Sequence, residues 1–466
     1  MTLQSTLQDM VTRIRKLETE LDRFKRMPRG VLKLNYVNDV DATGVSGGDF
    51  LSWNSVTEQW EIMGSGRDAF GRLRVSNPAA IFSSDMQYDK NLAVWNEKIT
   101  NGSGSAASAH QANESAVKLT VGSGVDEVIR QTKQFFNYQP GKSQLITMTF
   151  LPTPAETGLT QRYGYFHGND GIFFEINETG PEMVVRTSTS GAAVDGGITQ
   201  ANWNRDKLDG TGTSGITLDF SKTQILFIEF QWLGVGAVRV GFNVDGVSYV
   251  AHEFDHANVL TTVYMKTANL PIRYEVSSDG TLVGTADVLQ ICCDVASEGG
   301  QDYLRGLPFS SSNGVTVDAV TTREPVLAIR PSLTFNSITN RISSFLESVS
   351  IYTKDQSVRY EIVYGGTLTG ASFAAVNSGY SGMERDVSAT AISGGIVIFE
   401  GYTAIGGIGQ ATASNFNAFS ARVPIALDID GAHPTTPLTD SISVVVTSIP
   451  GSSTDVLAAI QWREIR

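Results

Sequence analysis

Cysteine and histidine are both scarce in this chain, whose 466 residues include 2 cysteines and 5 histidines. The two cysteines, Cys292 and Cys293, are adjacent. Neighbouring side chains of a strand point to opposite faces, so a disulfide between them has poor geometry and two buried thiols are expected. The scarcity of histidine counts against a hydrolytic enzyme, although chemistry by two carboxylates needs no histidine.

Long apolar runs are also missing from the sequence. No stretch reaches the roughly 18 apolar residues that a membrane-spanning helix requires. Polar residues follow Met1, where a secretory leader would have an apolar core. We therefore expect neither a membrane span nor a leader, and a protein that is made and assembled in a cytoplasm.

Basic residues are outnumbered by acidic ones over most of the chain. The net charge is -13, yet residues 1–33 carry eight Lys and Arg against four Asp and Glu, which leaves residues 34–466 near -17. Such an acidic body disfavours nucleic acid as a partner. The basic N-terminal stretch has the charge to dock on an acidic surface, but solvated charges on the outside of a helix are the simpler interpretation.

The most regular pattern that is present lies in residues 1–27. Apolar residues recur there at alternating spacings of four and three: Leu3, Leu7, Met10, Ile14, Leu17, Leu21 and Phe24. This spacing is a heptad seam, typical of a coiled coil. Oppositely charged residues flank the seam at the g and e positions of neighbouring parallel chains: Arg13 with Glu18, and Glu20 with Lys25. The alternative is one amphipathic helix folded on its own core.

The hexapeptide Arg13-Ile14-Arg15-Lys16-Leu17-Glu18 resembles the Arg-h-x-x-h-Glu trimerisation motif of short parallel coiled coils, in which Arg and Glu pair between chains. The resemblance implies a parallel homotrimer. Pro28 and Gly30 then end the helix.

The remainder of the chain reads as short strands joined by turns. Residues 50–53 and 60–63 predict a hairpin in which Trp53 and Trp60 lie close together. In residues 224–232, apolar side chains alternate with polar ones, and the same pattern returns in 238–244 and 247–254 around an Asp245-Gly246 turn. With 46 glycines and 18% charged residues, this patterning predicts a mainly β protein.

We therefore predict an N-terminal parallel trimeric coiled coil, a small β segment and two antiparallel β-sandwich domains of jelly-roll or lectin-like type. The expected bounds are 1–27, 28–66, 67–340 and 341–466, with the last boundary falling in residues 336–350.

Several segments are similar to structural proteins of tailed bacteriophages, especially the marine and cyanobacterial group. The similarity starts with the block Asp68-Ala69-Phe70-Gly71-Arg72-Leu73-Arg74-Val75-Ser76 and continues in residues 208–212, 231–236, 269–275 and 462–466. It implies a virion component, commonly a fibre or related surface protein, and it carries no catalytic motif.

Three motifs resemble known metal-binding or nucleotide-binding motifs, but the surrounding sequence does not predict the structure that each one needs. His252-Glu253-Phe254-Asp255-His256 has the letters of a zinc-protease helix but continues a strand, which would separate the two histidines by roughly 13 Å. A strand also follows the glycines at 234 and 236, where a dinucleotide site needs a helix. Residues 428–431 begin like a calcium loop but lack its Glu at the twelfth position, so a turn is expected. We predict no catalytic residue, metal site or cofactor.

Aromatic residues in expected loops are candidates for stacking on sugar rings, although each one singly is more often part of a core or an interface. They are Tyr163, Tyr165, Phe166, Trp203 and Tyr380.

The sequence as a whole favours a homotrimeric virion protein, most simply a tail fibre or receptor-recognising appendage, with other virion proteins and a host surface glycan as partners. A capsid-mounted head fibre or decoration protein would share every feature. A polysaccharide-degrading tailspike enzyme stays open, because two converging carboxylates cannot be picked out of 48 acidic residues.

Overall fold

The computed structural model describes residues 12–16, 50–54, 59–63, 78–300, 306–314, 317–319, 323–403, 425–435, 438–449 and 452–466. The chain divides into two compact units, Met1–Arg74 and Val75–Arg466. Among the residues described, no helix is long and apolar enough to cross a membrane.

The first unit contributes a helical turn at residues 12–16 and a two-stranded hairpin. The hairpin consists of β1 (Phe50–Asn54) and β2 (Gln59–Met63), which run antiparallel with Trp53 directly opposite Trp60. This confirms the hairpin and its register. The block at residues 68–76 lies outside the described residues.

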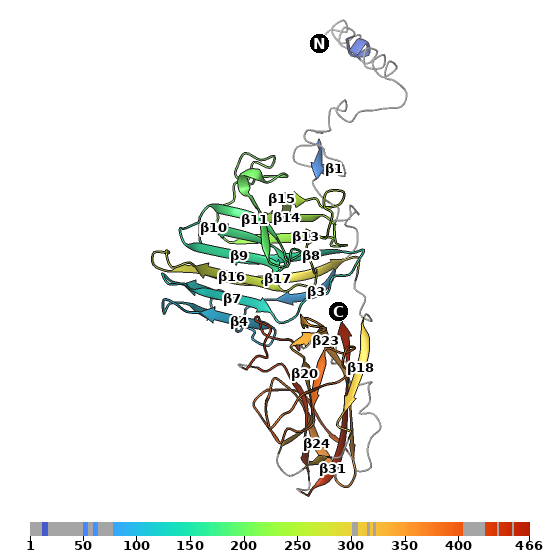
Figure 1. Cartoon of the computed structure of the whole chain (residues 1–466). Helices are drawn as coiled ribbons and strands as arrows, with labels where there is room; N and C mark the ends of the chain where they lie inside the picture. The colour runs from blue at the N-terminus through green and yellow to red at the C-terminus, as the bar shows by residue number, and fades with distance from the viewer. Residues whose placement is uncertain are drawn as a thin grey trace, which may run out of the picture. The chain divides into compact units, whose positions relative to one another are not determined.

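The second unit contains a large antiparallel sandwich followed by a smaller one (Figure 1). The first sheet of the large sandwich has seven strands, in the order β12 (Val194–Thr199), β11 (Gly180–Thr187), β10 (Gly171–Asn177), β9 (Leu159–Phe166), β16 (Ile272–Ser278), β7 (Glu127–Thr132) and β4 (Trp95–Thr100). The second sheet has eight strands, in the order β15 (Val247–Phe254), β14 (Val238–Val244), β13 (Gln224–Phe230), β8 (Ser143–Leu151), β17 (Ala286–Glu298), β6 (Ala116–Val121) and β5 (Ala107–Gln111), with β3 (Ala79–Ser84) paired to β17. The short 3₁₀ helix η2 (Gln200–Asn202) follows β12.

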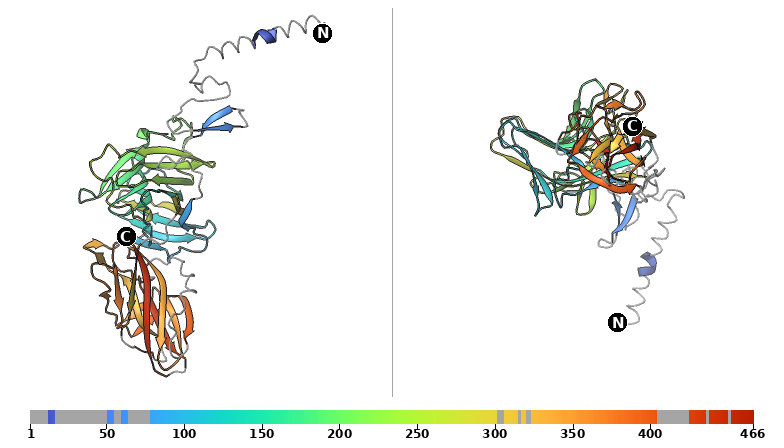
Figure 2. Two further views of the ribbon diagram at one scale, coloured as in Figure 1. Left: turned by 90° about the vertical axis from the view of Figure 1, so that its right-hand side faces the viewer. Right: turned by 90° about the horizontal axis from the view of Figure 1, so that it is seen from below.

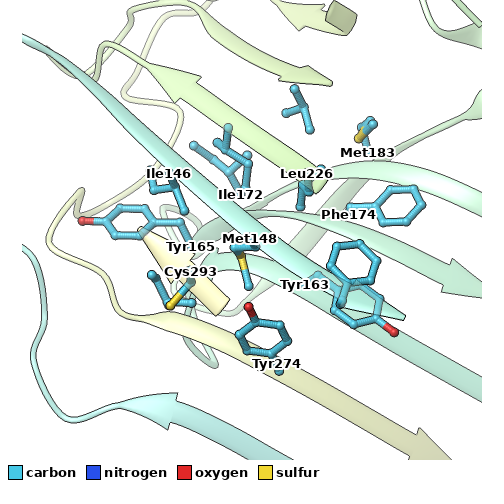
Figure 3. Packing of buried hydrophobic residues seen from close by; sticks show 14 of the residues in the cluster. Ile146, Met148, Tyr163, Tyr165, Ile172, Phe174, Met183, Leu226, Tyr274 and Cys293 are labelled. Atoms are coloured by element: carbon cyan, nitrogen blue, oxygen red, sulfur yellow. The ribbon is translucent and has the colours of Figure 1, made fainter. Parts of the chain in front are cut away.

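Period-two alternation places one face of each strand in a shared core, as predicted. In β13, Leu226, Ile228 and Phe230 are all fully buried in that core. Figure 3 shows residues of the two sheets interdigitating, with Met148 beside Tyr163 and Tyr274. Burial of each large apolar side chain contributes roughly 1.5–3 kcal/mol, so this layer dominates the stability of the sandwich.

The β14–β15 hairpin turns at Asp245 and Gly246, as its sequence predicts. Both residues have positive φ values, 50° and 81°. Positive φ at both central positions is the geometry of a type I′ turn, whose twist matches that of the flanking strands. The Asp-Gly pair is therefore the local reason why these two strands are neighbours.

The C-terminal sandwich, coloured orange to red in Figure 2, also has two antiparallel sheets. The four-stranded sheet contains β18 (Leu307–Ser312), β31 (Thr454–Ile465), β19 (Val317–Ala319) and β23 (Ser343–Thr353). The six-stranded sheet runs β26 (Ala374–Ala375), β27 (Met383–Asp386), β20 (Glu324–Pro331), β30 (Ile442–Ser448), β24 (Val358–Tyr364) and β29 (Ile396–Thr403). Two short ribbons are added by β21 (Thr334–Phe335) with β22 (Ile338–Thr339), and β25 (Thr367–Thr369) with β28 (Ala391–Ser393).

The change from one sandwich to the other falls between Glu298 and Leu307, earlier than the expected boundary in residues 336–350. Strands β18 and β20 pair with β31 and β30, which come more than 100 residues later in the chain. Alternation identified these segments as strands, but it carries no information about the partner of each strand.

The expectation of two buried thiols holds for Cys293 but not for Cys292, which is only half-buried. Both are free thiols in β17. Cys293 lies in the core, whereas Cys292 points the other way, where its Sγ is 3.4 Å from the Thr149 hydroxyl. The alternation of side chains along the strand thus separates the two sulfur atoms.

Candidate functional site

The predicted trimerisation residues fall mostly outside the described part of the chain. Of them, Arg13 and Ile14 lie in the described helical turn, where the side chains of all residues 12–16 are exposed. Ile14 is 53% exposed in the single chain. The three-stranded coiled coil itself stays a prediction, since the turn shows helix at the expected place and not its assembly.

The histidine motif has a structural role in this fold. His252 belongs to strand β15 and His256 follows the end of that strand, which confirms the extended interpretation. His252 Nδ1 accepts from the Asn204 backbone at 3.3 Å, and His256 Nδ1 lies 2.7 Å from the Gly236 carbonyl oxygen. Burial lowers the pKa of both histidines. Within the described ranges, no group of three or more His, Cys, Asp or Glu side chains is placed to hold a metal ion.

The two glycine-containing motifs form turns, as predicted. Gly234 has a φ of +81° in the connection between β13 and β14. Gly431, with a φ of +79°, donates its N–H to the Asp428 carbonyl at 2.9 Å. Both glycines occupy the left-handed region that side chains disfavour, which explains why glycine stands there.

The candidate aromatic residues separate into four buried side chains and one exposed one. Tyr163, Tyr165 and Phe166 lie in strand β9 and are fully buried, so their expected placement in a loop was wrong. Trp203 is 3% exposed and packs into the core, whereas Tyr380 is 73% exposed. Burial depends on what covers a residue from elsewhere in the chain, which local sequence does not reveal.

A charged network that the sequence did not single out covers the outer face of the seven-stranded sheet. It comprises Arg162, Arg186, Arg273, Glu175, Glu275 and Asp195. Its members lie on the side of each strand that faces away from the main core, and Phe166 and Phe173 share that side. Their convergence could not be read from the sequence, because the Arg162–Glu275 pair is 113 residues apart.

Strand register brings the centre of this network together. Arg162 of β9 stands opposite Glu175 of β10 on one side and opposite Glu275 of β16 on the other. The Arg162 Nε donates to Glu175 Oε2 at 2.6 Å, and its Nη1 donates to Glu275 Oε1 at 2.6 Å. Arg273 donates its Nε to the second oxygen of Glu275 at 2.7 Å. The guanidinium groups therefore fix both carboxylates in orientation.

An aromatic layer lies beneath the arginines. Phe166, Phe173 and Val184 form a small buried cluster separate from the main core. The Arg186 guanidinium carbon lies 5.0 Å from the Phe173 ring centroid, and that of Arg273 lies 5.3 Å from the Phe166 centroid. Cation–π contacts of this kind are worth roughly 0.5–2 kcal/mol each. They help to hold the arginines against the sheet.

The charges of this network favour the ionised form of Glu275. Burial alone would raise the pKa of Glu275, but Arg273 and Arg162 hold that pKa below its usual value. A glycosidase acid needs the opposite, a carboxyl whose pKa is raised. Desolvation does raise the pKa of Asp294. The residues opposite Asp294 on the two neighbouring strands are Thr147 and Ser83, so neither supplies a second carboxylate.

No family model and no curated protein matches the chain. Among solved structures, the chain is similar to a Bacteroides ovatus GH16 protein from a mixed-linkage glucan locus, with 11% identity, a TM-score of 0.31 and coverage of 46% of this chain and 99% of that one. The Emp47p carbohydrate recognition domain matches with 12% identity, a TM-score of 0.30 and coverage of 48% and 97%. A legume lectin-like domain from Entamoeba histolytica matches with 10% identity, a TM-score of 0.28 and coverage of 47% and 98%. At these identities and scores, the likenesses indicate neither a ligand nor an activity.

Proposed function

We propose that this chain is a homotrimeric structural protein of a bacteriophage particle, a tail fibre or receptor-recognising appendage that contacts the host surface. The observation that carries the proposal is Ile14, which is 53% exposed on a helical turn at an a position of the heptad seam. An isolated short helix is marginal in water, and parallel partners would cover this apolar side chain. The resemblance of several segments to phage structural proteins supports the same assignment.

The mechanism of attachment would be multivalent. Three chains joined at one end present three copies of each sandwich, so that a second contact forms at high effective concentration once the first is made. We propose a surface glycan as the ligand, because Tyr380, the exposed member of the candidate aromatic residues, offers a ring on which a sugar can stack.

Sedimentation equilibrium on the full chain tests the trimer. Ile14→Asp places a charge in the seam and should convert the trimer largely to monomer, whereas Lys16→Asp introduces the same residue at the solvated c position and should leave the trimer intact. A monomeric wild-type chain, or a trimer that survives Ile14→Asp unchanged, would refute the stalk as the determinant of assembly.

The location on the particle has a rival interpretation, a capsid-mounted head fibre or decoration protein with the same domains. A cryo-EM map of the intact particle distinguishes the two, since the proposal requires density for three parallel copies on the tail. Copies on the head would replace the tail-fibre assignment, and antiparallel or solitary copies would contradict both.

The enzymatic rival is a tailspike that degrades host polysaccharide. Glu175 and Glu275, the carboxylates closest to the centre of the charged network, are both ion-paired with Arg162. We therefore expect no oligosaccharide to be released when the full protein is incubated with host capsule or lipopolysaccharide. Released fragments that disappear in a Glu175→Gln variant would establish the enzyme instead.

A further inference from the structure

Tyr380 is an exposed aromatic residue on a loop that several hydrogen bonds hold in place. Its own N–H and that of Ser381 both donate to the Asn377 carbonyl at 2.9 Å, which closes the turn. The ring is 73% exposed, so the turn holds it in solvent and not in a core. Exposed tyrosines on ordered turns are common recognition residues, because the ring offers a large contact area at a low cost in conformational entropy.

A buried carboxylate anchors this loop to strand β31. Glu464 is 1% exposed, and its Oε1 accepts from the Ser381 hydroxyl at 2.5 Å and from the Trp462 indole at 2.9 Å. Its Oε2 accepts from the Gly382 N–H at 3.0 Å. On the other side, the Gly382 carbonyl accepts from Asn340 Nδ2 at 2.7 Å. The peptide groups next to Tyr380 are thus fixed from two directions.

An arginine lies against the same loop. The Arg466 guanidinium donates to the Tyr380 carbonyl and stands over the Phe335 ring at 4.5 Å. It also lies 3.5 Å from Glu464, whose negative charge balances its own. The side chain of Arg466 is 39% exposed, so it is partly open to solvent beside the loop.

We propose that Tyr380 and Arg466 form a contact site for the pyranose ring of an uncharged saccharide. This inference rests on the proposed host-contact function and names a site and a ligand class for it. The apolar C–H face of a sugar ring packs on the tyrosine face while the arginine donates to ring hydroxyls. Because Glu464 neutralises Arg466, the site favours an uncharged sugar over a carboxylate-bearing one. The anchored loop lowers the entropy lost on binding.

Saturation-transfer NMR on the full-length protein tests the site. The probes are the methyl glycosides of glucose, galactose and mannose, with galacturonic acid as the charged comparison. Wild type should transfer saturation to at least one neutral glycoside, and Tyr380→Ala should weaken that binding about tenfold. Tyr380→Phe keeps the ring and should bind like wild type. Tyr402→Ala is the matched control, because Tyr402 is 71% exposed on the edge strand β29.

The outcomes separate the site from the wider function. Unchanged binding by Tyr380→Ala would overturn the site while leaving host contact to another surface. Binding of galacturonic acid alone would overturn the assignment to uncharged sugars. An absence of transfer from every glycoside would overturn the site. The proposed function would then be tested by the sedimentation experiment and the particle map alone. Since Tyr380 is exposed, an unchanged melting temperature of Tyr380→Ala should show that the variant folds.

Discussion

Phe150 and Tyr163 stack with their ring centroids 3.7 Å apart and their planes 6° from parallel, although they belong to different sheets of the large sandwich. Phe150 comes from the eight-stranded sheet and Tyr163 from the seven-stranded one. The pair therefore joins the two sheets within the core, and its loss should destabilise both sheets.

Truncation of Phe150 tests the importance of this contact. Phe150→Ala removes a fully buried ring and leaves a cavity, so we expect a loss of about 3–5 kcal/mol in the free energy of unfolding. Ile225→Ala, on the neighbouring strand β13 but 40% exposed, should cost less than about 1 kcal/mol. Urea unfolding followed by tryptophan fluorescence measures both. Equal effects of the two substitutions would contradict the assigned core.

The charged network offers a second test. Arg162→Met leaves Glu175 and Glu275 without their shared partner in a buried setting, and breaking such a pair costs about 3–5 kcal/mol. Lys118→Met breaks a pair with Asp287 in which both side chains are more than a third exposed, and it should cost about 1 kcal/mol or less. Thermal unfolding of the two variants compares them. An Arg162→Met chain as stable as Lys118→Met would show that the network is solvated.

His167 predicts a dependence of stability on pH. Burial, reinforced by Arg341, lowers the pKa of His167 to about 4 in the folded chain, against an ordinary value of 6.5. Between these two pH values the unfolded chain binds more protons, so stability falls as the pH drops from about 6.5 to 4, by at most ~1.4 kcal/mol per pH unit from this group.

The variant His167→Asn keeps an acceptor for the Asn169 N–H, which donates to the His167 ring at 2.8 Å, and it should flatten this dependence. Urea midpoints measured at several pH values for wild type and variant give the comparison. Identical slopes would mean that His167 titrates normally in the folded chain.

The two cysteines should differ in reactivity. Burial raises the pKa of the Cys293 thiol well above its ordinary value, whereas Cys292 points away from the core. In a Cys292→Ser chain, iodoacetamide should label Cys293 at least about tenfold more slowly in buffer than in urea, because the thiolate is the reactive form. A Cys293→Ala chain, which retains Cys292, should show a smaller difference. Rapid labelling of Cys293 in the folded chain would contradict its burial.

Local patterns in the sequence were sufficient for features that a few neighbouring residues decide. The Asp245-Gly246 turn and the extended form of the His252 motif depend on backbone preference and on alternation along one strand. The same alternation was not recognised around Arg162, because Tyr163, Tyr165 and Phe166 were expected to lie in a loop. It did not show that Arg162 lies between Glu175 and Glu275, since that contact requires strands β9 and β16 to be neighbours.

By itself, then, the sequence determined that this protein is mainly β, where many of its strands and turns lie and which strand faces are apolar, because period-two patterning and turn chemistry act within a few residues. Tertiary structure alone decided the strand order and the boundary between the two sandwiches, which falls between Glu298 and Leu307. It also decided the charged network, and it left Tyr380 exposed while burying Tyr163. An apolar face specifies that it must be covered, and any complementary face of the chain can cover it. Long-range packing makes that choice, and with it the positions of the groups that are free to contact a partner.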